Sequence, residues 1–258
     1  MAELLAGDEP APAIVRAGRD ACRFLLVADH AGRAIPRALG DLGLGPADRD
    51  RHIAWDIGVA ALGEALAARL GAALVRQRYS RLVIDCNRAP GRADAIPEVS
   101  DGSAIPGNLA LDPAERAARV AAIHARYHAA IAAELARRDA LGLETVLVAL
   151  HSFTPQWAGL ARPWHAGVLH GGGNDRYAKA VLTALRAAIE APVGDNEPYA
   201  MDGIDYTVPH HCFAAGRAYA EIEIRQDLLA TDAQAEQWAG MLARVLEDAW
   251  LKATGTGA

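Results

Sequence analysis

The hydrophobic positions of the chain occur in short, nearly continuous apolar runs, separated by longer stretches with helical periodicity. The apolar runs that predict strands are residues 23–28, 72–79, 82–84, 144–150 and 166–170. Short runs of this kind, rich in β-branched or continuously apolar residues, are typical of strands buried on both faces of a parallel sheet. In residues 218–227 polar and apolar side chains alternate, which predicts one further strand.

Between these runs the apolar residues repeat every three or four positions, which predicts amphipathic helices. The predicted helices are residues 57–70, 112–140, a segment that ends near residue 189, and 231–252. Asp112 followed by Pro113 is typical of a helix N-terminus. Strands that alternate with helices predict an α/β fold, which we expect to be a three-layer α/β/α arrangement around a mixed, largely parallel central sheet.

The length of 258 residues fits one domain, and no linker or internal repeat divides the chain. We expect residues 1–258 to form this domain, with residues 1–20 as a partly ordered lead-in and residues 253–258 as a frayed tail. Residues 89–108 are rich in proline and glycine. So long an irregular segment within a domain is typical of a lid, a binding loop or a disordered segment.

Composition excludes several classes of partner. The formal net charge is −6 and no basic block is present, which argues against nucleic acid. No apolar run reaches the roughly 18 residues of a membrane span. The cysteines, Cys22, Cys86 and Cys212, match no zinc or redox pattern, and residues 1–20 have neither the positively charged start nor the apolar core of a signal peptide. They indicate a reduced, cytoplasmic setting, and we interpret Cys86 as a packing residue.

Histidines follow two of the predicted strands directly. His30 comes soon after residues 23–28, and His151 comes directly after residues 144–150. The sites of α/β sheets lie beyond the carboxyl ends of their strands, so two histidines in such places together favour a metal site. Asp56 stands at the start of the helix that follows the first strand, where its alternative role is to cap that helix.

Other polar residues at strand ends suit the binding and activation of a substrate. Arg88 and Asn87 follow residues 82–84, and the planar fork of a guanidinium beside an amide is suited to holding a carboxylate. The alternative for Arg88 is an ion pair with a nearby acid. Glu221 and Glu223 share one face of the strand at 218–227, which places a carboxylate where a general base could stand.

These residue types together describe a catalytic zinc site. Two histidines and a carboxylate that leave a fourth position open are the usual ligands of such a site. A glutamate that does not bind the metal then takes a proton from the metal-bound water, whose pKa zinc lowers to about 7. With an Arg/Asn pair to anchor a carboxylate, the constellation predicts hydrolysis of an amide bond in a small acidic molecule.

A second pair of histidines lies inside a predicted helix. His124 and His128 are four residues apart and so share one face of the helix at 112–140, which is the spacing of a metal pair. No glutamate follows His124, as the zincin pattern requires, and both residues border the apolar stripe. We therefore predict a packing role for this pair. His210 and His211 lie in a loop region, and the sequence indicates no role for them.

Several short motifs occur in a characteristic order. They are residues 29–36 (DHAGRAIP), 52–58 (HIAWDIG), 80–88 (SRLVIDCNR), 100–102 (SDG), 105–108 (IPGN), 151–155 (HSFTP) and 221–228 (EIEIRQDL). From about residue 25 to about residue 229 the chain resembles the N-formylglutamate amidohydrolases, within the zinc carboxypeptidase and aspartoacylase-like group. The resemblance implies the zinc carboxypeptidase-like version of the three-layer fold.

The resemblance also implies roles for individual residues. His30 and His151 match ligands of one zinc ion, and Glu223 matches the general base. Arg88 with Asn87 would grip the carboxylate of the substrate. Arg81 would stabilise the oxyanion, a contribution typically worth about 3 kcal/mol of the barrier.

One position departs from the pattern of the group. Its carboxylate ligand usually comes from a His-x-x-Glu motif, but Arg33 occupies the glutamate position here. We therefore expect Asp56 to be the carboxylate ligand, with Asp29 as the alternative. Glu221 remains the alternative to Glu223 as the base.

The function that the resemblance implies is zinc-dependent hydrolysis of N-formyl-L-glutamate or a similar N-acyl amino acid, in amino-acid catabolism. An alternative within enzymes is a carboxypeptidase-like or other N-acyl amino acid hydrolase on the same framework. An alternative of another class is a non-catalytic binding module that has kept the fold.

Overall fold

A seven-stranded mixed sheet forms the centre of the computed structural model, which describes residues 4–255. Its strands, in spatial order, are β1 (Ala13–Arg16), β3 (Ala73–Gln77), β2 (Phe24–Ala28), β6 (Val146–Phe153), β11 (Tyr219–Arg225), β9 (Ala166–Leu169) and β10 (Val193–Asp195). Strands β3, β2, β6 and β11 run parallel to their neighbours in this order. The antiparallel pairs are β1 with β3 and β11 with β9. The predicted α/β fold with a mixed, largely parallel sheet is confirmed.

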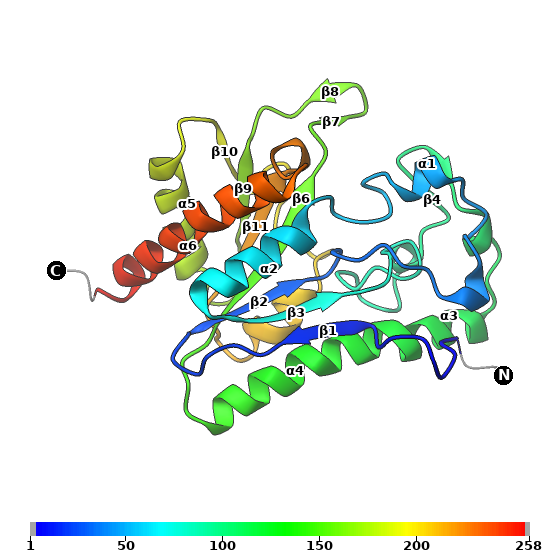
Figure 1. The fold of residues 1–258 in the computed structure, drawn as a ribbon, viewed down its shortest axis with the longest axis horizontal. Coiled ribbons are helices and arrows are strands. Elements are labelled where there is room, and N and C mark those ends of the chain that lie inside the picture. The colour runs from blue at the N-terminus through cyan, green and yellow to red at the C-terminus, as the bar shows by residue number, and fades with distance from the viewer. Residues whose placement is uncertain (1–3, 256–258) are drawn as a thin grey trace.

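Helices cover both faces of the sheet (Figure 1). On one face lie α2 (Val59–Leu70), α5 (Arg176–Ala188) and α6 (Asp232–Thr254), and α6 packs on both of the others. On the other face α4 (Ala125–Ala140) packs against β1 and β3. A π-helical turn, Val120–His124, joins α4 to α3 (Pro113–Arg119), so the predicted helix at 112–140 is one rod with a π-helical segment inside it.

The central strands are apolar because both of their faces are covered. Every residue of β2 and of β6 is buried, including the polar His151 and Ser152 near the carboxyl end of β6. Since β2, β6 and β11 are parallel, their carboxyl ends meet at one edge of the sheet. This edge is where the side chains that the sequence singled out converge.

Residues 82–84, which we predicted to be a strand, are buried but form a turn, so that prediction is wrong. Side chains from other parts of the chain satisfy their backbone carbonyls. Asn108 Nδ2 donates to the carbonyl of Leu82 at 2.8 Å, and Arg119 Nη1 donates to the carbonyl of Val83 at 3.0 Å. Because these groups already have partners, the segment has no need of a neighbouring strand.

The segments outside the predicted elements are also structured. Strand β1 lies within the expected lead-in at 1–20, and β10 was not predicted. The long segment 89–108 contains the hairpin of β4 (Val99–Ser100) and β5 (Ser103–Ala104). A second hairpin joins β7 (Gln156–Trp157) to β8 (Leu160–Ala161), while α1 (Pro46–Arg49) is a single helical turn. Of the expected lead-in and tail, residues 1–3 and 256–258 lie outside the described residues.

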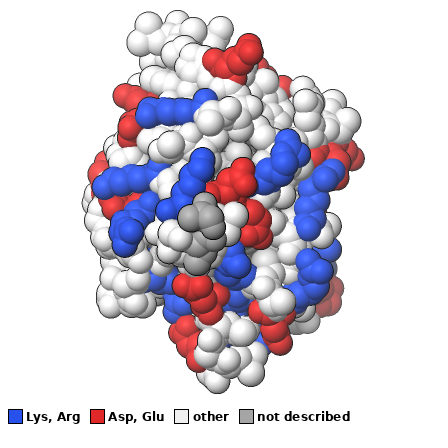
Figure 2. All heavy atoms as spheres, turned by 90° about the vertical axis from the view of Figure 1, so that its left-hand side faces the viewer, with Lys and Arg blue, Asp and Glu red and all other residues white. Residues whose placement is uncertain are grey.

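The surface carries charges of both signs. On the face that Figure 2 shows, basic and acidic side chains are interspersed. Ion pairs such as Arg23–Glu247 (3.1 Å) and Arg217–Asp139 (2.9 Å) join different elements, and exposed pairs of this kind contribute at most about 1 kcal/mol each. Among residues 4–255, no helix is both long enough and apolar enough to cross a membrane.

Candidate active site

The site is assembled from the ends of two central strands and the segment that leads into α2. Strand β2 ends at Ala28, and His30 follows in the turn beyond it, while His151 lies within the last residues of β6. The amide of Asp56 donates to the carbonyl of His30 at 2.8 Å, which fixes Asp56 beside the end of β2. Gly58, not Asp56, is the N-cap of α2, so the capping role that we weighed for Asp56 is not what its side chain does.

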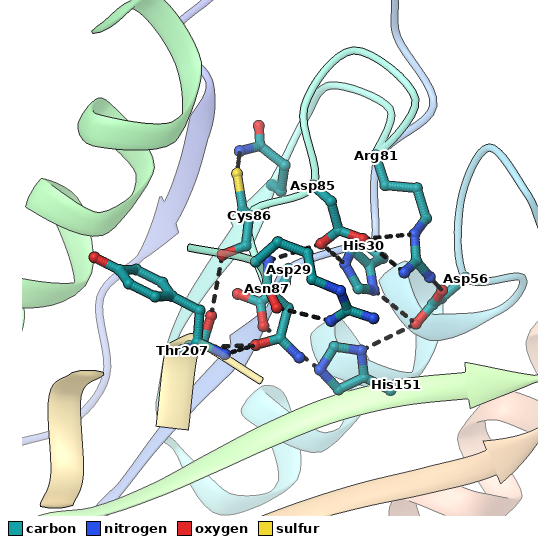
Figure 3. Close-up of polar contacts among 12 residues, drawn as sticks. Asp29, His30, Asp56, Arg81, Asp85, Cys86, Asn87, His151 and Thr207 are labelled. Atoms are coloured by element: carbon teal, nitrogen blue, oxygen red, sulfur yellow. Dashed lines mark hydrogen bonds and ion pairs between the residues drawn. The ribbon is translucent and has the colours of Figure 1, made fainter. Parts of the chain in front are cut away.

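His30, Asp56 and His151 form a buried group whose ligand atoms all lie within 4.8 Å of one another. The Asp56 carboxylate oxygen Oδ2 is 3.1 Å from His151 Nδ1 and 3.5 Å from His30 Nδ1. Figure 3 shows both imidazole rings turned toward this carboxylate. The three residues that we expected to hold a metal are therefore brought together.

The donor set fits a divalent ion such as zinc. His30 Nδ1 is buried and has no hydrogen-bond partner among the described residues, although it points into the group. Burial favours a neutral Asp56, but His30, His151 and Arg81 outweigh burial and hold the pKa of its carboxyl below the usual range. An ionised carboxylate between two imidazole nitrogens is the three-residue ligand set of catalytic zinc sites.

The outer nitrogens of both imidazoles face carboxylates. His30 Nε2 is 2.7 Å from Asp85 Oδ1, and His151 Nε2 is 3.5 Å from Asp29 Oδ2. Histidines that ligate metals usually bind a carboxylate through their second ring nitrogen, which fixes the tautomer and the ring orientation. Asp29 thus contacts the outer side of His151, and this placement favours Asp56 over Asp29 as the carboxylate ligand.

Arg81 contacts two of the carboxylates around the histidines, those of Asp85 and Asp56. Its Nε and Nη2 donate to Asp85 Oδ2 at 3.1 and 2.7 Å, and its Nη1 lies 3.4 Å from Asp56 Oδ1. Burial by itself lowers the pKa of Arg81, but Asp85 and Asp56 more than compensate and raise it. In Figure 3 the guanidinium stands between the two carboxylates. Arg81 is therefore a fixed cation at the edge of the candidate metal group.

Asp85 also belongs to this network, and it was not among the site residues that we predicted. It accepts hydrogen bonds from Arg81 and from the amide of Asn87 (2.8 Å), and it contacts His30. In the sequence, the sign that Asp85 belongs to the site was its position three residues before Arg88. It directly follows residues 82–84, which we wrongly predicted to be a strand. The outer contacts of a metal ligand depend on tertiary geometry that this spacing does not reveal.

We expect Asp85→Asn to lower zinc affinity by about 10- to 100-fold, because it weakens the contact that orients His30 and leaves Arg81 without its main partner. Competition with a chromophoric chelator measures this affinity, and circular dichroism checks the fold. Asp50→Asn is the matched control, since Asp50 is exposed and pairs only with Arg33 among the described residues. Wild-type zinc affinity in the folded Asp85→Asn protein would contradict the role of Asp85.

Asn87 and Arg88 lie together at the wall of the site, but with different surroundings. Asn87 Oδ1 accepts from the amides of Tyr206 and Thr207, both at 2.9 Å, and its Nδ2 donates to Asp205 Oδ1 at 3.2 Å. Arg88 Nη1 donates to the carbonyl of Asn87 at 2.8 Å. The side-chain amide of Asn87 is therefore already hydrogen-bonded to the segment 205–207.

The guanidinium of Arg88 contacts acids only loosely. Its Nε is 3.6 Å from Asp94 Oδ2, and its Nη1 is 4.0 Å from Asp205 Oδ1, so neither contact is a hydrogen bond. The ion pair that we weighed as the alternative role of Arg88 therefore exists in a weak form. The guanidinium also lines the cavity described next, so it remains available to a ligand.

A cavity of about 360 Å³ opens over the candidate metal ligands His30, Asp56 and His151. All seven predicted site residues line it, together with apolar side chains such as Phe153, Leu169 and Ile204. His52 also lines the cavity, and its contact with Asp101 (3.4 Å) links the rim to the β4–β5 hairpin. This volume suits a small molecule of the size of an acylated amino acid.

Glu223 and Glu221 enter the cavity from β11. Glu223 is paired with His151 in the strand register, whereas Glu221 is paired with Ala149, one pleat deeper. Each has a buried Oε2 without a hydrogen-bond partner among the described residues. Burial raises the pKa of Glu223 to about 7, and it raises the pKa of Glu221 well above its usual range. Glu223 is therefore the carboxyl whose pKa suits a base near neutral pH.

Four other histidines, at positions 124, 128, 210 and 211, pack behind this wall. His124 Nε2 is 3.0 Å from the carbonyl of Arg88, and His128 Nε2 is 2.9 Å from the carbonyl of Cys86. His128 Nδ1 is 3.0 Å from His211 Nε2, and the ring of His210 stacks on that of Tyr206. Among residues 4–255, the only group placed so that it could hold a metal ion is that of His30, Asp56 and His151. His124 and His128 thus have contacts of the packing kind that we predicted.

Comparisons with known proteins found a family and related structures. A family model described as N-formylglutamate amidohydrolase matches residues 22–230. A crystal structure of a gene product from Agrobacterium tumefaciens is 36% identical, with a TM-score of 0.92 over 96% of this chain and 98% of that one. The N-formylglutamate amidohydrolase from Ralstonia eutropha JMP134 is 20% identical, with a TM-score of 0.66 over 92% and 98%, and shares the fold. No curated protein matches the chain.

Proposed function

This chain belongs to the N-formylglutamate amidohydrolase family, and from that premise we propose that it uses one zinc ion to hydrolyse the amide bond of N-formyl-L-glutamate or a similar N-acyl amino acid. Membership makes the chain an amidohydrolase, not a binding module. We also propose that residues 1–258 form a single domain.

The observation that carries the proposal is the convergence, in one cavity, of two histidines, a carboxylate and a glutamate whose Oε2 has no hydrogen-bond partner among residues 4–255. His30, Asp56 and His151 would hold the zinc ion, since their ligand atoms are close together and buried. Zinc, when bound, supplies Lewis acidity toward the amide carbonyl and lowers the pKa of a coordinated water. Glu223 lies next to His151 in the sheet and faces the same cavity.

Glu223 is suited to move the proton in both halves of the reaction. Its Oε2 has no competing hydrogen bond from the part of the chain that the structure describes, and its pKa of about 7 lets it accept a proton from the attacking water at neutral pH. The same oxygen then donates that proton to the amine nitrogen as the carbon–nitrogen bond breaks. The products are a carboxylic acid, formate in the case of a formyl group, and the free amino acid.

The two arginines would have separate tasks. Nε and Nη2 of Arg81 are held by Asp85, so Nη1, with its long 3.4 Å contact to Asp56, is the donor left for the oxyanion. Arg88 would bind the carboxylate of the substrate with the rest of its fork. Asn87 would assist it mainly by holding the wall, because its amide is already bonded to segment 205–207.

We also place this activity in the cytoplasm, as a step in amino-acid catabolism. The support is that Cys22, Cys86 and Cys212 are all free thiols and buried, as expected in a reducing compartment.

The test is a substrate panel assayed on the purified full-length chain. We expect N-formyl amino acids to be hydrolysed faster than their N-acetyl counterparts, and C-terminal peptide bonds slowest. We expect treatment with a chelator to remove the activity and stoichiometric zinc to restore it. Two results together would contradict the proposal: protein without stoichiometric zinc, and activity that survives chelation.

A further inference from the structure

One arginine beside the cavity has no acidic partner. Arg162 directly follows β8, and its backbone amide donates to the carbonyl of Pro155 at 2.8 Å, which holds it at the base of the β7–β8 hairpin. Its guanidinium lies within ion-pair distance of no carboxylate among residues 4–255. By contrast, Arg81 and Arg88 each lie within 4.0 Å of two carboxylates. The charge of Arg162 is therefore available to a ligand.

Aromatic rings hold this guanidinium at the cavity wall. Cζ of Arg162 lies 4.9 Å from the ring centroid of Tyr199, 5.7 Å from that of Trp157 and 5.8 Å from that of Phe153. Phe153 and Tyr199 line the cavity. In Figure 1 the β7–β8 hairpin projects beyond the carboxyl end of β6, which is the end where the candidate site lies. Contacts with aromatic faces position a guanidinium without neutralising its charge.

Tyr199 connects this cation to the cavity. Arg162 Nη1 donates to the hydroxyl of Tyr199 at 3.0 Å, so the oxygen acts as an acceptor and its own proton is left to donate. Within the part of the chain that the structure describes, that proton has no acceptor. Partial burial and the charge of Glu223 raise the pKa of Tyr199, so the hydroxyl keeps its proton at neutral pH. A hydroxyl backed by a guanidinium is a donor suited to an anionic oxygen.

The acids that line the cavity have other compensating groups. Asp56 would face the divalent ion that the proposed function places beside it, and Asp205 lies 4.0 Å from Arg88. Burial raises the pKa of Glu221 well above its usual range, which favours its neutral form. With the metal ion and Arg88 already assigned, Arg162 is the cation left for one more carboxylate.

We propose that Arg162 and Tyr199 form a second carboxylate site, which binds the side-chain carboxylate of the substrate while Arg88 binds its α-carboxylate. This inference rests on the proposed amide hydrolysis and names two specificity-determining residues for it. The hydroxyl of Tyr199 donates to the carboxylate, and Arg162 supplies the compensating charge. One cation for each carboxylate lets both be desolvated without leaving a buried charge unpaired.

The substitution Arg162→Ala tests the charge. N-formyl-L-glutamate and N-formyl-L-glutamine have the same shape and differ in one charge. We expect the zinc-loaded full-length chain to prefer the glutamate compound. In Arg162→Ala, kcat/KM for that compound should fall by at least about tenfold, mainly through KM, while the value for the glutamine compound changes by less than about twofold.

Three outcomes of this experiment would contradict us. Equal losses on both compounds would make Arg162 a support of the wall, and a wild-type preference for the glutamine compound would exclude a second cationic site. Either result would overturn the inference and leave the proposed amide hydrolysis intact. Hydrolysis of neither compound by the wild type would overturn both.

Two further variants separate the charge from the hydroxyl. Arg162→Lys keeps the charge and should restore kcat/KM for the glutamate compound by at least about threefold over Arg162→Ala. Tyr199→Phe keeps the ring beside the guanidinium, and it should lower kcat/KM for the glutamate compound at least about threefold more than for the glutamine compound. If Tyr199→Phe lowers kcat equally on both, the hydroxyl acts on the reacting amide and the second carboxylate site is wrong.

Arg23→Ala is the matched control. Cζ of Arg23 lies 5.0 Å from the ring centroid of Trp250, so this arginine also contacts a tryptophan, but it pairs with Glu247 and does not line the cavity. We expect its ratio of kcat/KM values to equal that of the wild type. A shift as large as in Arg162→Ala would show that selectivity follows the overall charge of the protein, which would overturn the assignment to Arg162.

Discussion

Replacing Glu223 with glutamine should lower kcat by about 10²- to 10⁴-fold while zinc stays bound, because the amide keeps the shape of the side chain but is not a base. The carboxyl lies in the cavity beside His151, its Oε2 has no hydrogen-bond partner within residues 4–255, and burial raises its pKa to about 7. Steady-state kinetics on an N-formyl substrate measure the loss, and metal analysis of the same sample measures retained zinc.

Glu221→Gln is the matched control for this substitution. Burial raises the pKa of Glu221 well above its usual range, which favours the neutral acid, and a neutral acid resembles the glutamine that replaces it. We therefore expect a much smaller change in kcat. The opposite result, near-normal turnover in Glu223→Gln and its loss in Glu221→Gln, would identify Glu221 as the general base.

The second large effect concerns the two arginines of the cavity. Arg81→Ala should lower kcat by about 10²- to 10³-fold with little change in KM, as the removal of an oxyanion donor does. Arg88→Ala should instead raise KM, because the α-carboxylate loses its anchor in both the bound substrate and the transition state. The measurement is a full kinetic analysis of both variants on one substrate.

The zinc content of both variants is part of this test. Arg81 also contacts Asp85 and Asp56, so its removal takes away a cation that both buried carboxylates contact. If Arg81→Ala loses turnover in proportion to lost zinc, the arginine supports the metal group and is not an oxyanion donor. If the two variants have the same kinetic profile, the division of tasks between Arg81 and Arg88 is wrong.

The parts of the site that the sequence predicted are those tied to local patterns. His30 and His151 were found because each follows an apolar run that had to be a buried strand, and parallel strands bring their carboxyl ends together. Asp56 was proposed as their partner because it stands at the start of the first predicted helix, although the segment between the end of β2 and α2 is long. The alternation in β11 put Glu221 and Glu223 on one face but left the choice between them open.

The parts that the sequence did not predict depend on contacts between distant segments. The apolar run 82–84 reads as a strand until Asn108 and Arg119 are known to bind its carbonyls. The occupied amide of Asn87 depends in the same way on segment 205–207, more than a hundred residues later. In both cases side chains satisfy backbone groups, and no periodicity in the sequence records such bonds.

The bonds of Asn87 have a consequence for protein engineering. One amide side chain holds the backbone of Tyr206 and Thr207 and also contacts Asp205, so the segment that lines the cavity is not an independent module. Exchange of residues 200–208 with a relative should transplant substrate preference only where the recipient has asparagine at the position of Asn87. Without this asparagine, the exchanged segment would have the same side chains but would lose the hydrogen bonds that position its backbone at the cavity.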